Sequence, residues 1–166
     1  MKLGVNTVLF KKFPVREAVL MAKRAGYDGV ELSAIQGMCE HLVLDEWEKQ
    51  KEELIALREE TGMEFLSMEA ATNDRARIEK AFAAAQALGI PLVNIGPGGS
   101  AAEGEESLQK QLAMICDFAA LAKTYGVTLG VKAHVGAAVY NTPTTLRMME
   151  ASADVGVDMD PSHIYR

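Results

Sequence analysis

The residue types best suited to proton transfer lie close together in the last third of the chain. Lys132 and His134 are two positions apart at the end of one predicted strand, and Asp160 and His163 follow the end of the next. Side chains two apart in a strand share one face of the sheet, so Lys132 and His134 should point the same way. Ionisable groups at adjacent strand ends suit acid, base and electrostatic roles. We therefore predict that Lys132, His134 and His163 are catalytic, with Asp160 beside them.

A second set of polar residues falls at the predicted carboxyl ends of the other four strands. Its members are Asn6, Glu31, Glu69 and Asn94. Polar side chains at the end of an apolar sheet are costly unless they are paired or used, which predicts that these four bind substrate. For Glu31 and Glu69, a structural ion pair with a neighbouring Lys or Arg is an equal alternative. Asp158 is expected to hydrogen-bond Lys132 or the backbone.

Short β-rich segments that alternate with helical ones must position these residues. The predicted strands are 3–8, 29–32, 64–68, 92–95, 128–131 and 156–159. Their starts lie about 26 to 36 residues apart, close to the ~30 residues of one strand-helix unit. Regular alternation of this kind predicts an α/β fold with a parallel sheet.

The predicted helices carry start and stop signals. Asp45 with Glu48 forms a candidate capping box, Asn73 is a candidate N-cap, and Thr142 with Pro143 opens a later helix. Glycines that suit a left-handed helix end precede four of the strands, at positions 26, 62, 89 and 126.

The glycine-rich segment 96–104 directly follows the fourth predicted strand. Loops at the carboxyl ends of parallel strands build the active sites of such folds, and backbone amides in a glycine-rich turn could hold a phosphate. A mobile loop in which glycines only provide sharp turns is at least as good an interpretation. The segment matches neither a P-loop nor a dinucleotide-binding motif.

The composition limits the classes of function. The 166 residues fit a single domain, 1–166, and the formal charge of −6 argues against a nucleic-acid partner. Two widely separated cysteines suggest free thiols rather than disulfides or a zinc site. No apolar run approaches the length of a membrane span and no signal peptide is visible, so we expect a cytoplasmic protein without a membrane partner.

Two motifs then carry a family resemblance that extends over most of the chain. They are Gly26-Tyr27-Asp28-Gly29-Val30-Glu31-Leu32 and Asp160-Pro161-Ser162-His163. Together they resemble the sugar phosphate isomerase/epimerase family, the xylose-isomerase-like TIM barrels related to endonuclease IV. The resemblance implies a (β/α)8 barrel. This chain contains about six of the eight units, so we expect an incomplete barrel.

The resemblance also implies a divalent metal, Mn, Co, Mg or Zn, held by ligands from four strands. Asp160 matches the metal ligand of the sixth strand, and His163 matches a histidine that contacts substrate. Lys132 stands where the family has a metal-binding Glu, and an ammonium cannot ligate a cation. The ligands of the seventh and eighth strands have no counterpart in this sequence.

These matches and departures leave three hypotheses. In the first, a sugar or sugar-phosphate isomerase or epimerase uses Lys132 in place of the metal, as an electrostatic group, a base or a Schiff-base former. In the second, the chain is a remnant barrel that binds carbohydrate without turnover. An endonuclease IV-like phosphodiesterase ranks last, because only three histidines are present and the charge is acidic. Open edges at the first and sixth strands would favour a homo-oligomer.

Overall fold

The computed structural model describes residues 1–164 and contains one parallel sheet with the order β1-β2-β4-β5-β6-β7. The strands are β1 (Gly4–Asn6), β2 (Gly29–Ile35), β4 (Glu64–Glu69), β5 (Leu92–Ile95), β6 (Thr128–Lys132) and β7 (Val155–Asp158). All five neighbouring pairs in this order are parallel. The prediction of an α/β, TIM-barrel-type fold with about six units is confirmed. Within residues 1–164 the sheet does not close, because β1 and β7 do not pair with each other.

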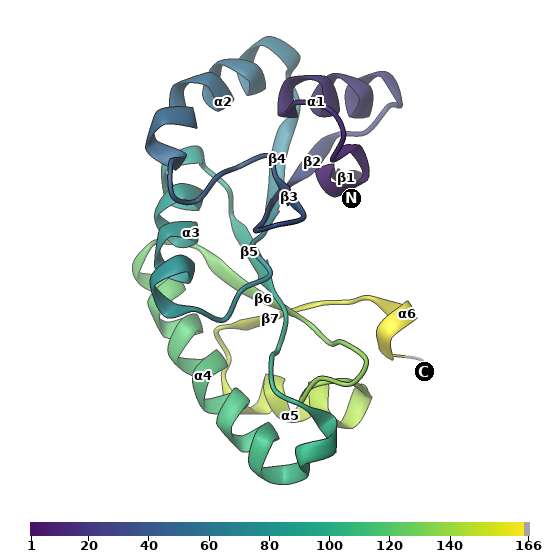
Figure 1. The fold of residues 1–166 in the computed structure, drawn as a ribbon, viewed down its shortest axis with the longest axis vertical. Coiled ribbons are helices and arrows are strands. Elements are labelled where there is room, and N and C mark those ends of the chain that lie inside the picture. The colour runs from purple at the N-terminus through teal and green to yellow at the C-terminus, as the bar shows by residue number, and fades with distance from the viewer. Residues whose placement is uncertain (165–166) are drawn as a thin grey trace.

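Helices follow the six parallel strands along the chain. They are α1 (Val15–Arg24), α2 (Trp47–Thr61), α3 (Arg75–Leu88), α4 (Gly104–Thr124), α5 (Thr142–Ala151) and α6 (Pro161–Ile164), with 3-10 turns η1 (Thr7–Phe10) and η2 (Ala101–Glu103). Figure 1 shows an arc in which α2, α3 and α4 line the convex side. The opposite, concave face of the sheet is therefore the face left for a site.

The core lies between the sheet and the helices. On β2, Val30, Leu32 and Ala34 are fully buried, and on α3 and α4 so are Phe82 and Ile115. Because strand side chains alternate between faces, the residues between them on β2, including Glu31, are directed to the concave face. Apolar packing on one side thus fixes which polar residues line the other.

The four glycines predicted to end helices do so with positive φ: 86° at Gly26, 67° at Gly62, 68° at Gly89 and 67° at Gly126. Thr142 opens α5 as predicted, with Asn141 as its N-cap and Thr144 completing a capping box. These local signals determine where each helix ends and the next strand begins.

Two predicted caps are wrong because their side chains are used elsewhere. The N-cap of α2 is Glu46 without a side-chain cap bond, while the Asp45 carboxylate pairs with Lys80 and Arg77. Asp74, not Asn73, caps α3 by accepting from Arg77 N at 2.8 Å. In the orientation that satisfies its neighbours, the Asn73 amide donates to Gly96 O at 3.0 Å. Tertiary contacts therefore outweighed the local capping pattern at both helices.

A short antiparallel strand was not predicted. β3 (Cys39–Glu40) pairs with Ala34 and Ile35 at the end of β2, and Ser33 Oγ donates to Cys39 O at 2.8 Å. This hairpin places Ile35 and Met38 at the carboxyl end of the sheet. Cys39 and Cys116 are free thiols, as expected.

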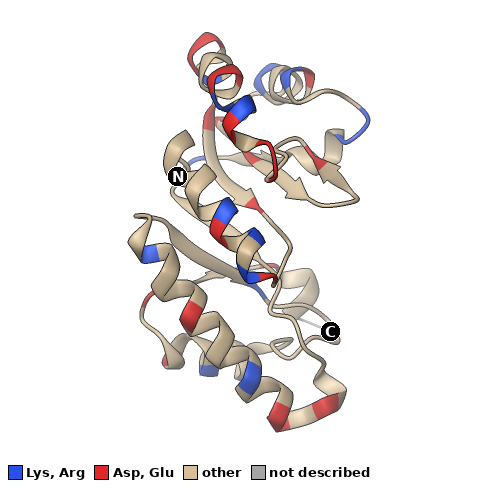
Figure 2. Cartoon of the chain, turned by 60° about the vertical axis from the view of Figure 1, so that its left-hand side comes forward, with Lys and Arg blue, Asp and Glu red and all other residues tan. Residues whose placement is uncertain are grey.

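Charged side chains of both signs are interleaved on the helices (Figure 2). No helix among residues 1–164 is both long enough and apolar enough to cross a membrane.

Candidate functional site

Six polar side chains from the six parallel strands meet on the concave face. We call them the rim cluster: Asn6, Glu31, Glu69, Asn94, Lys132 and Asp158. Hydrogen bonds and ion pairs join all six into one network. The structure thus brings together the four residues predicted to bind substrate and adds Lys132 from the predicted catalytic group.

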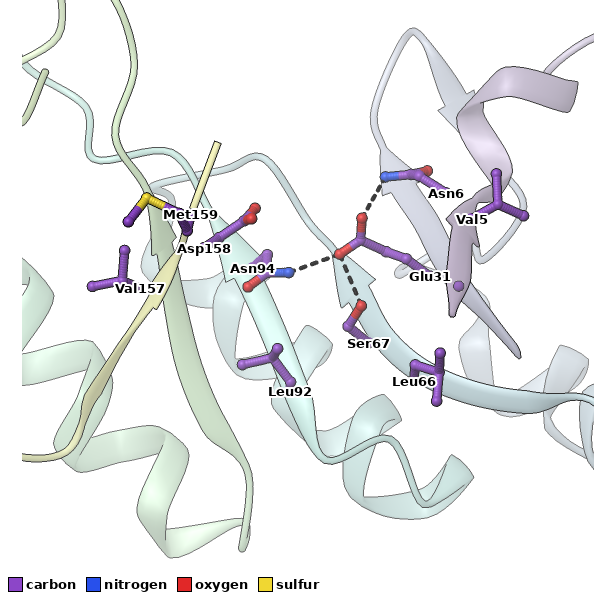
Figure 3. A pocket seen from close by; sticks show the side chains of 11 residues that line it. Val5, Asn6, Glu31, Leu66, Ser67, Leu92, Asn94, Val157, Asp158 and Met159 are labelled. Atoms are coloured by element: carbon purple, nitrogen blue, oxygen red, sulfur yellow. Dashed lines mark hydrogen bonds between the residues drawn. The ribbon is translucent and has the colours of Figure 1, made fainter. Parts of the chain in front are cut away.

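Glu31 lies at the centre of this network (Figure 3). Its Oε1 accepts from Asn94 Nδ2 at 2.7 Å and from Ser67 Oγ at 2.9 Å, and its Oε2 accepts from Asn6 Nδ2 at 2.7 Å. Burial raises the pKa of the Glu31 carboxyl above its usual range, although the bonds from Asn94 and Ser67 oppose the shift. The sequence left open an ion pair of Glu31 with a Lys or Arg. In the structure, its carboxylate instead accepts hydrogen bonds from three neutral side chains.

Ser67 reaches Glu31 because of an irregularity in β4. The register between β2 and β4 shifts after Val30, so that Phe65 faces Val30 while Ser67, not Leu66, faces Glu31. Such a bulge reverses which alternate residues point to each face. Ser67 and Glu69 consequently join the concave face, while Met68 is buried in the core. Ser67 was not predicted, since no residue type in this stretch marks a bulge.

Asn94 occupies space left by a missing side chain on β6. A Cβ added to Gly130 would lie 2.0 Å from Asn94 Oδ1. The Asn94 side chain is buried, and Oδ1 has no hydrogen-bond partner among the described residues, while Nδ2 holds Glu31. Because Gly130 has no side chain, Asn94 can adopt the orientation in which its Nδ2 donates a hydrogen bond to Glu31.

Lys132 is held between two carboxylates. Its Nζ lies 3.5 Å from Glu69 Oε1 and 3.4 Å from Asp158 Oδ2, and Asp158 is its direct neighbour in the register of β6 and β7. Burial lowers the pKa of Lys132, but the charges of Glu69 and Asp158 outweigh it and the net pKa is raised. Lys132 is accordingly a protonated ammonium at neutral pH. This corrects the suggestion that desolvation frees it as a base or Schiff-base former.

The other predicted catalytic residues lie one layer further toward the carboxyl ends. The rings of His134 and His163 are stacked, with centroids 4.1 Å apart and planes 30° from parallel. His163 Nε2 lies 3.6 Å from Asp160 Oδ2, and Asp160 Oδ1 accepts from Ser162 N at 2.9 Å and from Ser162 Oγ at 2.6 Å. The bonds from Ser162 lower the pKa of Asp160, with His163 contributing less. The Asp-Pro-Ser-His turn thus brings His163 back over His134.

Two cavities open on this face. One, of about 350 Å³, is lined by the inner part of the rim cluster together with Leu66 and Leu92. The other, of about 390 Å³, lies at the carboxyl ends of the strands, where Glu69, Lys132 and His134 meet an apolar wall of Val8, Ile35 and Met38. Together they offer charged groups next to apolar surface, as in small-molecule sites.

The glycine-rich loop after β5 is tied to the protein. Ser100 N donates to Ser107 Oγ at 3.0 Å, Ala101 N to Gly136 O at 2.9 Å, and Ala102 N to Ser100 Oγ at 3.2 Å. Glu103 N and Gly104 N donate to carbonyls of the same turn. The consecutive amides of residues 100–104 therefore already have acceptors.

Comparison with known families identifies the fold and its relatives. Residues 19–166 match the model of the xylose isomerase-like TIM barrel family. The chain belongs to this family. The comparison with curated proteins gave no significant match.

Among solved structures, several xylose isomerase-like barrels have the same fold. The probable 3-DHS dehydratase AsbF of Bacillus anthracis is 18% identical, with a TM-score of 0.78 over 99% of this chain and 65% of that one. An IolI protein with a bound zinc atom is 16% identical, with a TM-score of 0.78 over 99% and 64%. The 3-keto-D-glucoside 4-epimerase YcjR of E. coli is 16% identical, with a TM-score of 0.70 over 95% and 67%. The chain spans less than two thirds of the first two.

A xylose isomerase-like barrel raises the question of a metal, since the IolI structure contains zinc. Among residues 1–164, no three His, Cys, Asp or Glu side chains come together as a metal-binding group. Asp160, the predicted ligand, is engaged by Ser162 and His163, and the Lys132 ammonium occupies the space between Glu69 and Asp158. The described residues therefore do not fit the expected metal site.

Proposed function

We propose that this chain is an isomerase- or epimerase-like protein that moves a proton next to the carbonyl of a sugar. The observation that carries the proposal is the Lys132 ammonium held between Glu69 and Asp158 beside the larger cavity. Proton removal next to a carbonyl develops negative charge on oxygen, and a fixed cation in a partly buried site stabilises that charge. Three structural relatives are named as epimerases or epimerase-like proteins: YcjR, a D-tagatose 3-epimerase-like protein and a D-allulose 3-epimerase, which supports this class of reaction.

The stacked histidines are the proposed proton carriers. His134 lines the same cavity as Lys132, and His163 stacks on it. An imidazole can accept a proton from carbon and can return one to the neighbouring carbon. In this scheme Lys132 stabilises the enediolate oxygen, and Asp160, 3.6 Å from His163 Nε2, helps to orient the His163 ring.

The remaining rim residues are proposed to orient the sugar. Amide and carboxylate groups suit hydroxyl groups, because together they donate and accept hydrogen bonds. Glu69 lines the larger cavity, whereas Asn6, Glu31 and Asn94 line the smaller one. Glu31 would act mainly by fixing the amides of Asn6 and Asn94.

A second candidate function is carbohydrate binding without turnover. It is favoured by the pairing of the rim cluster within itself, which leaves Lys132 neutralised by two carboxylates. In that case Lys132 would fix the shape of the site rather than stabilise a reaction intermediate.

Deuterium exchange from solvent into the carbon next to the carbonyl separates the two functions. Ketoses and aldoses incubated in D₂O with the protein should gain deuterium at that carbon, detected by NMR. Lys132→Ala should lower the exchange rate by about 10²- to 10³-fold, the range for loss of one electrostatic group at a reacting oxygen. Lys123→Ala, which removes a surface lysine paired with Asp154, is the matched control and should exchange at the wild-type rate. Sugar binding without exchange would favour the second function.

A further inference from the structure

We propose that the part of the substrate lying on the rim cluster is an uncharged polyol, so that this face selects free sugars over sugar phosphates. The inference rests on the proposed function of the same site and names its substrate class. It follows from the balance of charge on the concave face, from the backbone bonds of the glycine-rich loop, and from the groups left to contact a ligand.

The charge balance opposes a phosphate. Lys132 is the only Lys or Arg among the described residues that line the two cavities, whereas Glu31, Glu69 and Asp158 all line them. Two of these carboxylates already neutralise the ammonium, at 3.4 and 3.5 Å. A phosphate dianion would meet like charge in a partly desolvated site, where repulsion is stronger than in water.

The second half of the glycine-rich segment, residues 100–104, does not offset this repulsion. The amides of Ser100, Ala101 and Ala102 donate to protein oxygens, as do those of the next two residues. Binding an anion there would require these bonds to break. The carboxylates of Glu103 and Glu106 also lie at this end of α4. The second half of the glycine-rich segment, residues 100–104, is thus a packed turn with acidic neighbours.

The remaining groups match a polyol. The carboxylates of Asp158 and Glu69 line the two cavities and can accept hydrogen bonds from ligand hydroxyls. The apolar wall of Val8, Ile35 and Met38 faces the charged groups across the larger cavity and suits the C–H surface of a sugar. An uncharged ligand with hydroxyl and C–H faces satisfies both sides.

Ligand-observed NMR titration with D-fructose, D-fructose 1-phosphate and D-fructose 6-phosphate tests the proposal. The expected result is binding of D-fructose and about tenfold or weaker binding of both phosphates, with a smaller difference at high salt because salt screens the repulsion. Binding of either phosphate as tightly as D-fructose would overturn the proposal. So would no detectable binding of D-fructose.

A matched pair of variants tests the charge argument itself. Asp158→Asn removes one carboxylate beside Lys132 and should narrow the difference in binding affinity between D-fructose and its phosphates. Asp154→Asn removes the carboxylate of another Asp–Lys pair, at the opposite end of β7, and should leave the difference unchanged. If both variants changed the difference in affinity between D-fructose and its phosphates equally, the result would contradict a local repulsion of phosphate by the carboxylates beside Lys132.

The result of this titration can be distinguished from the result of the deuterium-exchange test of the proposed function. D-fructose binding without deuterium exchange would leave the uncharged substrate class standing while the isomerase reaction fails. Deuterium exchange that is faster with a sugar phosphate than with D-fructose would leave the isomerase reaction standing while the uncharged substrate class fails.

Discussion

Lys132 and Asp158 face each other across the last two strands of the sheet, with Nζ 3.4 Å from Oδ2. Glu69 approaches the same ammonium from β4, at 3.5 Å. The Lys132 ammonium therefore lies among carboxylates, at the strand end where the family resemblance led us to expect a metal-binding Glu. The first prediction follows from this arrangement.

We predict that the purified protein retains less than one equivalent of Mn, Co, Zn or Mg, measured by elemental analysis after dialysis. Lys132→Glu should bind Mn more tightly than the wild type, because it replaces the ammonium with a third carboxylate beside Glu69 and Asp158. Lys132→Met is the control, since it removes the ammonium without adding an oxygen ligand. Stoichiometric metal in the wild-type protein would contradict the assignment of Lys132 as the resident cation.

Gly130→Ala should displace the Asn94 amide. The added Cβ would lie 2.0 Å from Asn94 Oδ1, too close for any real contact, so the side chain must move and its bond to Glu31 must lengthen or break. We expect a loss of about 1 to 3 kcal/mol in the free energy of unfolding, the usual cost of overpacking, measured by urea denaturation. Gly96→Ala is the matched control, because no atom lies within 4 Å of its added Cβ. Equal stability of the two variants would show that Asn94 does not depend on Gly130.

The raised pKa of Glu31 predicts a specific pH dependence of stability. Folding raises this pKa above 4.5, so the native state holds the proton more tightly than the unfolded state. The resulting stabilisation is complete below pH 4.5 and is lost as the pH rises through the native pKa. The free energy of unfolding of the wild type, measured relative to that of Glu31→Gln, should therefore fall as the pH rises. A constant difference between the two proteins across this range would refute the burial effect.

Glu105 on α4 should titrate well below the usual range. Hydrogen bonds from Arg147 and Gln109 lower the pKa of its carboxyl from 4.5 to about 2. Because this pKa is depressed, its contribution to stability is present above pH 4.5 and is lost as the pH falls toward about 2. NMR titration of the Glu105 carboxyl should show this pKa, and Arg147→Met should move it back toward 4.5. Glu106→Gln is the neighbouring control and should leave the Glu105 titration unchanged.

The sequence by itself determined most of the fold. Strand-helix alternation, with glycines at the helix ends, located all six parallel strands, because these signals are local and repeat in every unit. The same alternation placed Asn6, Glu69, Asn94 and Lys132 at or next to the carboxyl ends of their strands. For Glu31 this prediction is wrong, because β2 continues through the hairpin to Ile35 and Glu31 is its third residue. The sequence also anticipated the pairing of Asp158 with Lys132.

Only the tertiary structure decided how these residues are paired. The bulge that turns Ser67 toward Glu31 depends on the register of β4 against β2, which no residue of β4 specifies alone. The gap at Gly130 matters only because Asn94 from the neighbouring strand fills it. Asp45 does not cap α2 as predicted but forms ion pairs with Lys80 and Arg77, both on α3. The pKa of Lys132 rose rather than fell because two carboxylates from other strands outweigh its burial. Contacts between distant segments set each of these outcomes, so the sequence located the candidate site but not the pairing of its side chains.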